Sequence, residues 1–161
     1  MGGFGGGSFG SGPYGGLSTP TRTFFPDAMP DIRQWLRNHP YLADLSGGRV
    51  FFTIPPKPSA APFVRIYRSG GGPLGDPHDA PVSNLRLGID VWGMKGADYQ
   101  KVRQTVLAIE AAAHDLPPGT VLGDNDTVGM NLNITTAVDT PDPSTGWPRI
   151  YLDAIFTVRV A

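Results

Sequence analysis

The stretch from residue 98 to residue 116 constrains the fold more than any other part of this 161-residue chain. Its apolar residues recur at spacings of three and four, the repeat of one face of an α-helix. A helix of about five turns with one apolar stripe must bury that stripe against another element. Asp98 favours the first turn, and Pro117 and Pro118 stop the helix. The stripe comprises Tyr99, Val102, Val106, Ile109, Ala113 and Leu116.

Several β-strands are predicted around this helix, and they supply the surface across which it should lie. Residues 150–160 alternate between apolar and other residues without a break, as a strand with one buried face does. Residues 128–138 alternate more weakly and predict another strand. Residues 85–91 predict a half-buried strand, with Arg86, Asp90 and Trp92 on the side opposite the apolar residues.

The remaining elements come before these. Asp27 stands where an N-cap belongs, ahead of a short helix that ends before Pro40. Its apolar face would carry Ile32, Trp35, Leu36 and His39. Strands are predicted over residues 49–54 and 63–68, and the Gly- and Pro-rich residues 69–81 predict a loop. The order α-β-β-β-α-β-β predicts an α+β fold, in which a mixed, mainly antiparallel sheet packs against one long helix.

Composition limits the domain organisation. A chain of 161 residues fits a single domain, which we expect over residues 25–161. Nine of the first sixteen residues are Gly, with Phe4, Phe9 and Tyr14 between them and no charge. Residues 1–24 are therefore expected to form a Gly-rich flexible arm. It is either a disordered leader or an arm whose aromatic side chains dock on a neighbouring subunit.

The residues offer no recognisable catalytic or cofactor chemistry. There is no Cys, the three His are far apart in sequence, and no Gly-x-Ser-x-Gly elbow is present. The Gly-rich run at residues 70–72 lacks the Lys-Ser/Thr ending of a phosphate-binding loop. The net charge of −1 gives no general attraction for nucleic acid or for an anionic membrane. We therefore expect no enzyme activity, no cofactor, no metal site and no membrane contact.

Arginines in or beside the predicted strands are the most informative polar residues. Several guanidinium groups projecting from one sheet face would form either a solvated outer face or an oligomer interface, where Arg pairs with carboxylates. Trp92 and Trp147 favour the interface, since Trp anchors such contacts. The arginines are Arg65, Arg68, Arg86, Arg149 and Arg159.

The motifs of the chain, taken in order, resemble the tail terminator proteins of long-tailed phages that infect actinobacteria. The resemblance covers residues 26–160 and rests on residues 31–36 (DIRQWL), residues 68–71 (RSGG), residues 90–93 (DVWG) before an Ala-rich helix, and residues 140–149 (TPDPSTGWPR) before the last strand.

This resemblance implies a small α+β subunit of a virion structural protein. The subunit would form a homohexameric ring at the tail–neck junction, cap the tail tube and stop its growth. Its partners would be further copies, the tube protein and the head-completion or neck protein, with DNA passing through the lumen without sequence-specific binding. Assembly would take place in the host cytoplasm. The residues expected at an oligomer or neck interface are Arg68, Gly70, Gly71, Asp142, Trp147 and Arg149.

Two other functions remain open from the sequence. Another neck or head-completion ring subunit, or a tail-tube subunit, would share a small mixed sheet and ring assembly. A small-ligand-binding or enzymatic α+β domain would need a deep pocket with convergent polar groups, and no residues are evidently placed to form one.

Overall fold

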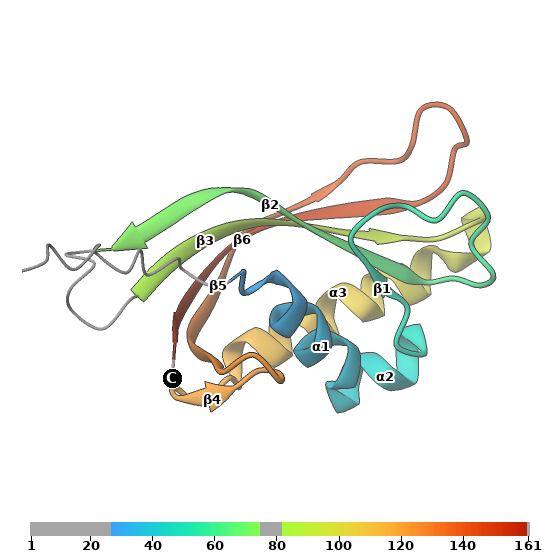
Figure 1. Cartoon of the computed structure of the whole chain (residues 1–161). Coiled ribbons are helices and arrows are strands. Elements are labelled where there is room, and N and C mark those ends of the chain that lie inside the picture. The colour runs from blue at the N-terminus through green and yellow to red at the C-terminus, as the bar shows by residue number, and fades with distance from the viewer. Residues whose placement is uncertain (1–26, 75–81, 161) are drawn as a thin grey trace, which may run out of the picture.

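The computed structural model describes residues 27–74 and 82–160, and within them one curled six-stranded sheet covers three helices on one face (Figure 1). The helices are α1 (Met29–Asn38), α2 (Pro40–Ser46) and α3 (Tyr99–His114). The strands are β1 (Val50–Phe51), β2 (Phe63–Leu74), β3 (Val82–Trp92), β4 (Thr120–Val121), β5 (Thr127–Asp139) and β6 (Arg149–Val160). This architecture confirms the expected α+β fold.

The sheet has the order β1-β2-β3-β6-β5-β4, and every pair except β1 with β2 is antiparallel. The four long strands form its centre, and the two-residue strands β1 and β4 lie at its edges. The mainly antiparallel, mixed sheet is as predicted.

The helix predicted from the apolar stripe is α3, which packs across the sheet. Five of the six stripe residues are buried, and Ile109 and Val102 have no exposed surface. Tyr99, at the start of the stripe, remains 36% exposed, and its hydroxyl donates to Asp139. Asp98 accepts hydrogen bonds from the backbone N–H groups of Met94 and Lys95, so it fixes the turn that leads into the helix.

The structure adds a helix and a strand to the predicted order. The helix α2 begins at Pro40, one residue after α1 ends, because proline is well suited to the first turn of a helix. The prediction treated Pro40 only as the end of the first helix. The short strand β4 pairs with the start of β5, and two residues carry too little pattern for alternation to reveal them.

Two predicted boundaries were wrong. The strand expected over residues 49–54 ends at Phe51. The loop expected over residues 69–81 begins later, because β2 continues through Gly70, Gly71 and Gly72 to Leu74 and stays paired with β3. Gly71 has φ +84, and a Cβ on it would overlap the carbonyl oxygen of Asn84. Glycine there permits the strands to approach closely, which a count of loop-forming residues does not reveal. Residues 75–81 and the predicted arm, residues 1–24, lie outside the described residues.

The strand β3 is buried on both faces from Leu87 to Trp92, where a half-buried strand was expected. Helices cover its apolar face. On the other face Gly88 has no side chain, and Tyr67 of β2 occupies the space a Cβ would need. Asp90 and Trp92 are covered as well, so a charged side chain is buried in the middle of the sheet.

Candidate functional site

The carboxylate of Asp90 is the centre of the polar arrangement on the sheet face away from the helices. Arg149 of β6 donates from Nε and Nη2 to Asp90 Oδ1, at 2.9 and 2.7 Å. Arg65 of β2 lies 3.8 Å away, from Nη1 to Asp90 Oδ2. The side chain of Asp90 has no exposed surface, whereas Arg65 and Arg149 are 28% and 27% exposed. Two arginines thus cover one buried charge.

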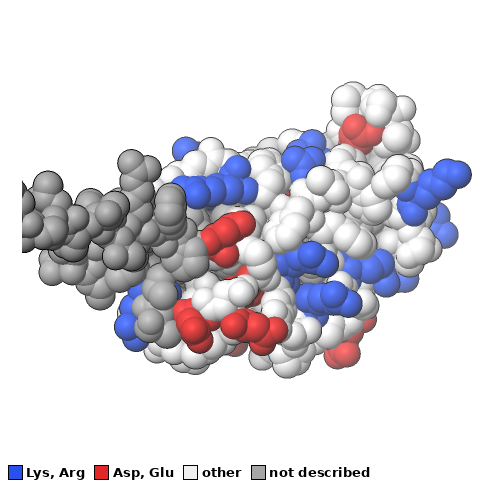
Figure 2. All heavy atoms as spheres, viewed as in Figure 1, with Lys and Arg blue, Asp and Glu red and all other residues white. Residues whose placement is uncertain are grey.

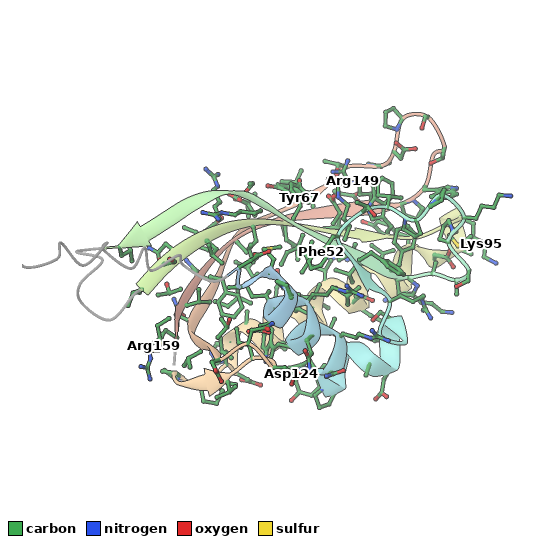
Figure 3. All side chains as sticks on the ribbon, in the orientation of Figure 1. Phe52, Tyr67, Lys95, Asp124, Arg149 and Arg159 are labelled. Atoms are coloured by element: carbon green, nitrogen blue, oxygen red, sulfur yellow. The ribbon has the colours of Figure 1, made fainter. Side chains whose placement is uncertain are left out.

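Aromatic rings complete this arrangement. The Arg149 guanidinium lies 5.0 Å from the centre of the Trp92 ring, and that of Arg65 lies 4.3 Å from the centre of the Tyr67 ring. Trp92 also stacks parallel to Phe63, with ring centres 6.2 Å apart. Figure 3 shows Tyr67 and Arg149 on the same side of the sheet, opposite the helices. Cation–π contact and ion pairing together fix both guanidinium planes.

A second ion pair lies farther along the same face. Arg86 of β3 donates from Nε and Nη2 to the two oxygens of Asp153 on β6, at 3.1 and 2.7 Å. The bidentate bond with Arg86 lowers the pKa of the Asp153 carboxyl, and the same contact raises the pKa of Arg86. Arg65, Arg86 and Arg149 therefore do share a sheet face, but each meets a carboxylate of its own chain.

The predicted interface residues fall into two separate groups. In the first, Arg68 donates from Nε to the carbonyl oxygen of Gly70 and from Nη2 to that of Gly71, at 3.1 and 2.7 Å. These bonds span an irregularity of β2, where the pairing register shifts between Arg68 and Gly70. The exposed guanidinium therefore stabilises a bulge within its own strand.

The second group lies in the turn between β5 and β6. The Asp142 carboxylate accepts hydrogen bonds from the hydroxyls of Ser144 and Thr145 and from the backbone N–H of Thr145. Gly146 has φ +68, and Trp147 accepts a backbone bond from Asp142 through its carbonyl oxygen. Asp142 therefore closes this turn through its own side chain, and Gly146 permits the positive φ that the turn requires. These hydroxyl bonds lower the pKa of Asp142, with that from Thr145 the largest cause.

The structure does not bring the two groups together. In the register of the sheet, Arg149 lies opposite Trp92 of β3, and Arg68 lies opposite Leu87, which is five residues away on the same strand. Five residues of a strand span about 17 Å. Arg149, which was expected at an interface, meets a carboxylate of its own chain, Asp90.

The sequence analysis missed a second buried carboxylate. Asp31 of α1 has no exposed surface, and it accepts hydrogen bonds from both nitrogens of Asn125 and from the N–H of Thr127. A Cβ on Gly123 would lie 2.5 Å from Asp31 Oδ1. These contacts fasten the β4–β5 turn to α1. Asp31 stands next to the apolar face of its helix, but its partners are more than ninety residues away in sequence.

The described residues contain no group of three or more His, Asp or Glu that could hold a metal ion. Of the helices in the described ranges, none combines the length and the apolar character that crossing a bilayer requires. The surface of the described residues includes depressions of about 420 and 440 Å³. One lies between the end of α3 and β5, and the other lies along α1.

Comparison with known proteins assigns a family to this fold. The model of the family described as tail completion protein gp17 matches residues 30–159, which is most of the chain. The chain belongs to this family. The family is one of phage tail proteins, so the expected class of virion structural protein is confirmed at that level. A search of functionally characterised proteins gives no match.

A solved structure shares the fold of this family member. It is a chain in the structure described as "Virion of native gene transfer agent (GTA) particle", with a TM-score of 0.61 and 21% sequence identity. The similarity covers 80% of this chain and 91% of that one.

Proposed function

We propose that this tail completion protein is a tail terminator, a ring-forming subunit that caps the last ring of the tail tube and stops its growth. The family match over residues 30–159 carries the proposal. We infer further that the ring has six copies, stands at the tail–neck junction of a long-tailed phage of actinobacteria, and joins the tube to the head-completion protein. The similar chain belongs to a virion, which supports a place in the particle for this chain as well.

Two unpaired strand edges support assembly through the sheet. Among the described residues, β1 pairs only with Val64 and Arg65 of β2. The rest of β2 therefore has a free outer edge. Likewise β4 pairs only with Val128 and Gly129, which leaves the outer edge of β5 free from Met130 to Asp139. Each edge presents N–H and C=O groups that another chain can pair with.

The strand directions suit closure into a ring. Along the sheet, β2, β3, β6 and β5 alternate in direction, so β5 runs opposite to β2. Rotation about an axis along the strands leaves their directions unchanged. The β5 edge of one copy would therefore meet the β2 edge of the next copy antiparallel, as the other long strands pair. Such a head-to-tail contact closes when the rotation is a whole fraction of a turn.

The charge distribution supports a structural role in which DNA passes through the ring without sequence-specific binding. The net charge is −1, and three arginines of the face away from the helices contact two carboxylates of the same chain, Asp90 and Asp153. We propose no catalytic activity and no cofactor. Assembly of the virion would take place in the host cytoplasm.

Tail length in the parent phage tests the proposal. Without the gene, tails should grow to irregular lengths and fail to join heads, because nothing caps the tube. Supplying the chain in trans should restore one length and head attachment. Electron microscopy measures both. Tails of normal length without the gene would contradict a terminator and favour another neck ring, and polymerisation of the purified chain into open tubes would favour a tube subunit.

A further inference from the structure

Three arginines gather around the turn that joins α2 to β1. Gly47 and Gly48 form this turn, with φ of 57° and 70°. Because neither glycine has a side chain, Arg37 and Arg49 pack directly against it. A Cβ on Gly47 would lie 2.7 Å from Arg49 Nη1, and one on Gly48 would lie 3.3 Å from Arg37 Cγ. In the described part of the chain no carboxylate lies within 4.0 Å of these two arginines or of Arg33.

Backbone contacts hold two of the guanidinium groups in place. Arg33 donates from Nε to the carbonyl oxygen of Val50 at 3.0 Å, and Arg49 donates from Nε to that of Pro62 at 3.1 Å. In each case the bond uses Nε and leaves the two terminal nitrogens to donate elsewhere. A guanidinium group that is already held in this way loses less conformational entropy when it binds a carboxylate.

An apolar side chain is exposed beside these arginines. Phe52 is 37% exposed and lies under the Arg33 guanidinium, 5.1 Å from it to the ring centre. Ile54, two residues farther along the chain, is also 37% exposed. The depression of about 440 Å³ runs along the same side of α1. Figure 2 shows blue atoms gathered over α1 and β1, and Figure 3 shows Phe52 among them. The depression is lined by Pro30, Arg33, Gln34, Arg37 and Asn38.

We propose that this depression, lined by Arg33 and Arg37, together with the neighbouring Arg49 and Phe52, binds an acidic segment with apolar side chains from another virion protein. Carboxylates of the segment pair with the free guanidinium nitrogens, and its apolar residues cover Phe52. The inference goes beyond termination of the tube, since it concerns a partner bound on the helical side of the molecule.

The surroundings favour a protein segment over a nucleic acid. Gln34, in the wall of the depression, donates to Asp124 at 3.3 Å, so a carboxylate already stands at the rim. Duplex DNA carries a charge about every 1.7 Å along its axis and would bring phosphates against that carboxylate. A peptide can place a few carboxylates on the arginines and apolar groups elsewhere. Exposed Phe52 and Ile54 also suit a peptide better than a phosphate backbone.

Fluorescence anisotropy with the purified full-length chain tests this surface. The probe is a labelled short peptide of alternating Glu and Leu, with the Gln–Leu peptide as its control. The Glu peptide should bind, and added salt should weaken binding. Arg37→Glu should weaken it by about tenfold or more, since it removes one charge-assisted contact and adds repulsion. Arg37 makes no hydrogen bond through its guanidinium in the described residues, so this variant should still fold. Arg103 is an exposed arginine on α3, and the control variant Arg103→Glu should bind the Glu peptide as the unmodified chain does.

Three results would overturn the proposal. The first is equal binding of the Glu and Gln peptides, or binding that Arg37→Glu leaves unchanged. The second is tighter binding of a labelled duplex DNA that Arg37→Glu abolishes, which would assign the surface to nucleic acid. The third is loss of ring formation in Arg37→Glu at an unchanged melting temperature, which would make the occupant a second copy. Failure of the tail-length experiment leaves this binding assay unaffected, so the two proposals fail separately.

Discussion

Asp90 is the residue on which the polar face of the sheet depends. Its carboxylate has no exposed surface, and among the described residues only Arg149 donates hydrogen bonds to it, both to Oδ1. Within the same residues Oδ2 has no hydrogen-bond partner, and the nearest charge to it is that of Arg65 at 3.8 Å. A buried carboxylate is costly unless it is paired, so the two arginines offset the cost of burying Asp90 within the sheet.

Removing either side of this contact should lower the free energy of unfolding. Asp90→Ala should cost about 3 to 5 kcal/mol, because two guanidinium groups lose their shared partner. Arg149→Lys keeps the charge but loses the planar fork, and should cost about 1 to 3 kcal/mol. Urea unfolding of the isolated subunit measures both. Arg159→Lys, an exposed arginine of the same strand, should change stability by about 0.5 kcal/mol or less. A normally stable Arg149→Lys subunit would show that the Asp90 contact contributes little.

The Asp142 turn offers a pH-dependent test at a single residue. The hydroxyl of Thr145 stabilises the charged carboxylate and lowers its pKa below the usual 3.8. Because the folded pKa lies below the unfolded one, this stabilisation is complete above about pH 4 and is lost as pH falls through the folded pKa. Thr145→Val should raise the Asp142 pKa, as followed by carbon NMR of the carboxyl.

The control for that experiment is Thr135→Val. Thr135 donates to Asp153 and not to Asp142, so the Asp142 titration should stay as in the unmodified chain. If the pKa of Asp142 is unchanged in Thr145→Val, the turn is held by its backbone bonds alone.

At the residue scale, the sequence reveals local contacts and not long-range ones. The Asp142 turn could be predicted because its partners are within three residues of it. The partners of Asp90 and Asp31 come from strands and turns far along the chain. Only the pairing of β3 with β6 brings Arg149 near Asp90, and alternation within one strand says nothing about which strand lies beside it.

At the scale of elements, long periodic segments were predicted well and short ones were missed. The helix α3 and the strand β6 follow from repeats sustained over eleven residues or more. By contrast, α2 has seven residues and β4 has two, and β2 passes through a glycine run that predicts a loop. In that run the pairing with β3 overrides local preference.

The apolar stripe of α3 provides a matched pair of substitutions on one helix. Ile109 has no exposed surface, and Ile109→Ala should lower the free energy of unfolding by about 2 to 5 kcal/mol. Leu107 is 59% exposed, so Leu107→Ala should change it by less than about 0.5 kcal/mol. Thermal melting of both variants measures the difference. Equal melting temperatures would mean that the stripe does not anchor the helix to the sheet.

At the scale of the whole molecule, the sheet has a covered face, a face of internal ion pairs and two free edges. Helices cover the first face, and three arginines of the second are paired within the chain. Among the described residues, the outer edges of β2 and β5 are then left largely without strand partners. The proposed contacts between copies would then lie at the edges, and the proposed contact with an acidic partner over α1.

Proline substitutions on β5 test whether its edge joins neighbouring copies. Successive N–H groups of a strand point to opposite sides, so of Ala137→Pro and Val138→Pro one removes a donor toward β6 and the other an outward donor. The variant that loses the donor toward β6 should lower the melting temperature of the subunit. The variant that loses the outward donor should leave the melting temperature within a few degrees but prevent ring assembly, as native mass spectrometry would show. Ala137→Ser and Val138→Thr keep both donors and should assemble normally. Rings formed by both proline variants would show that copies meet through another surface.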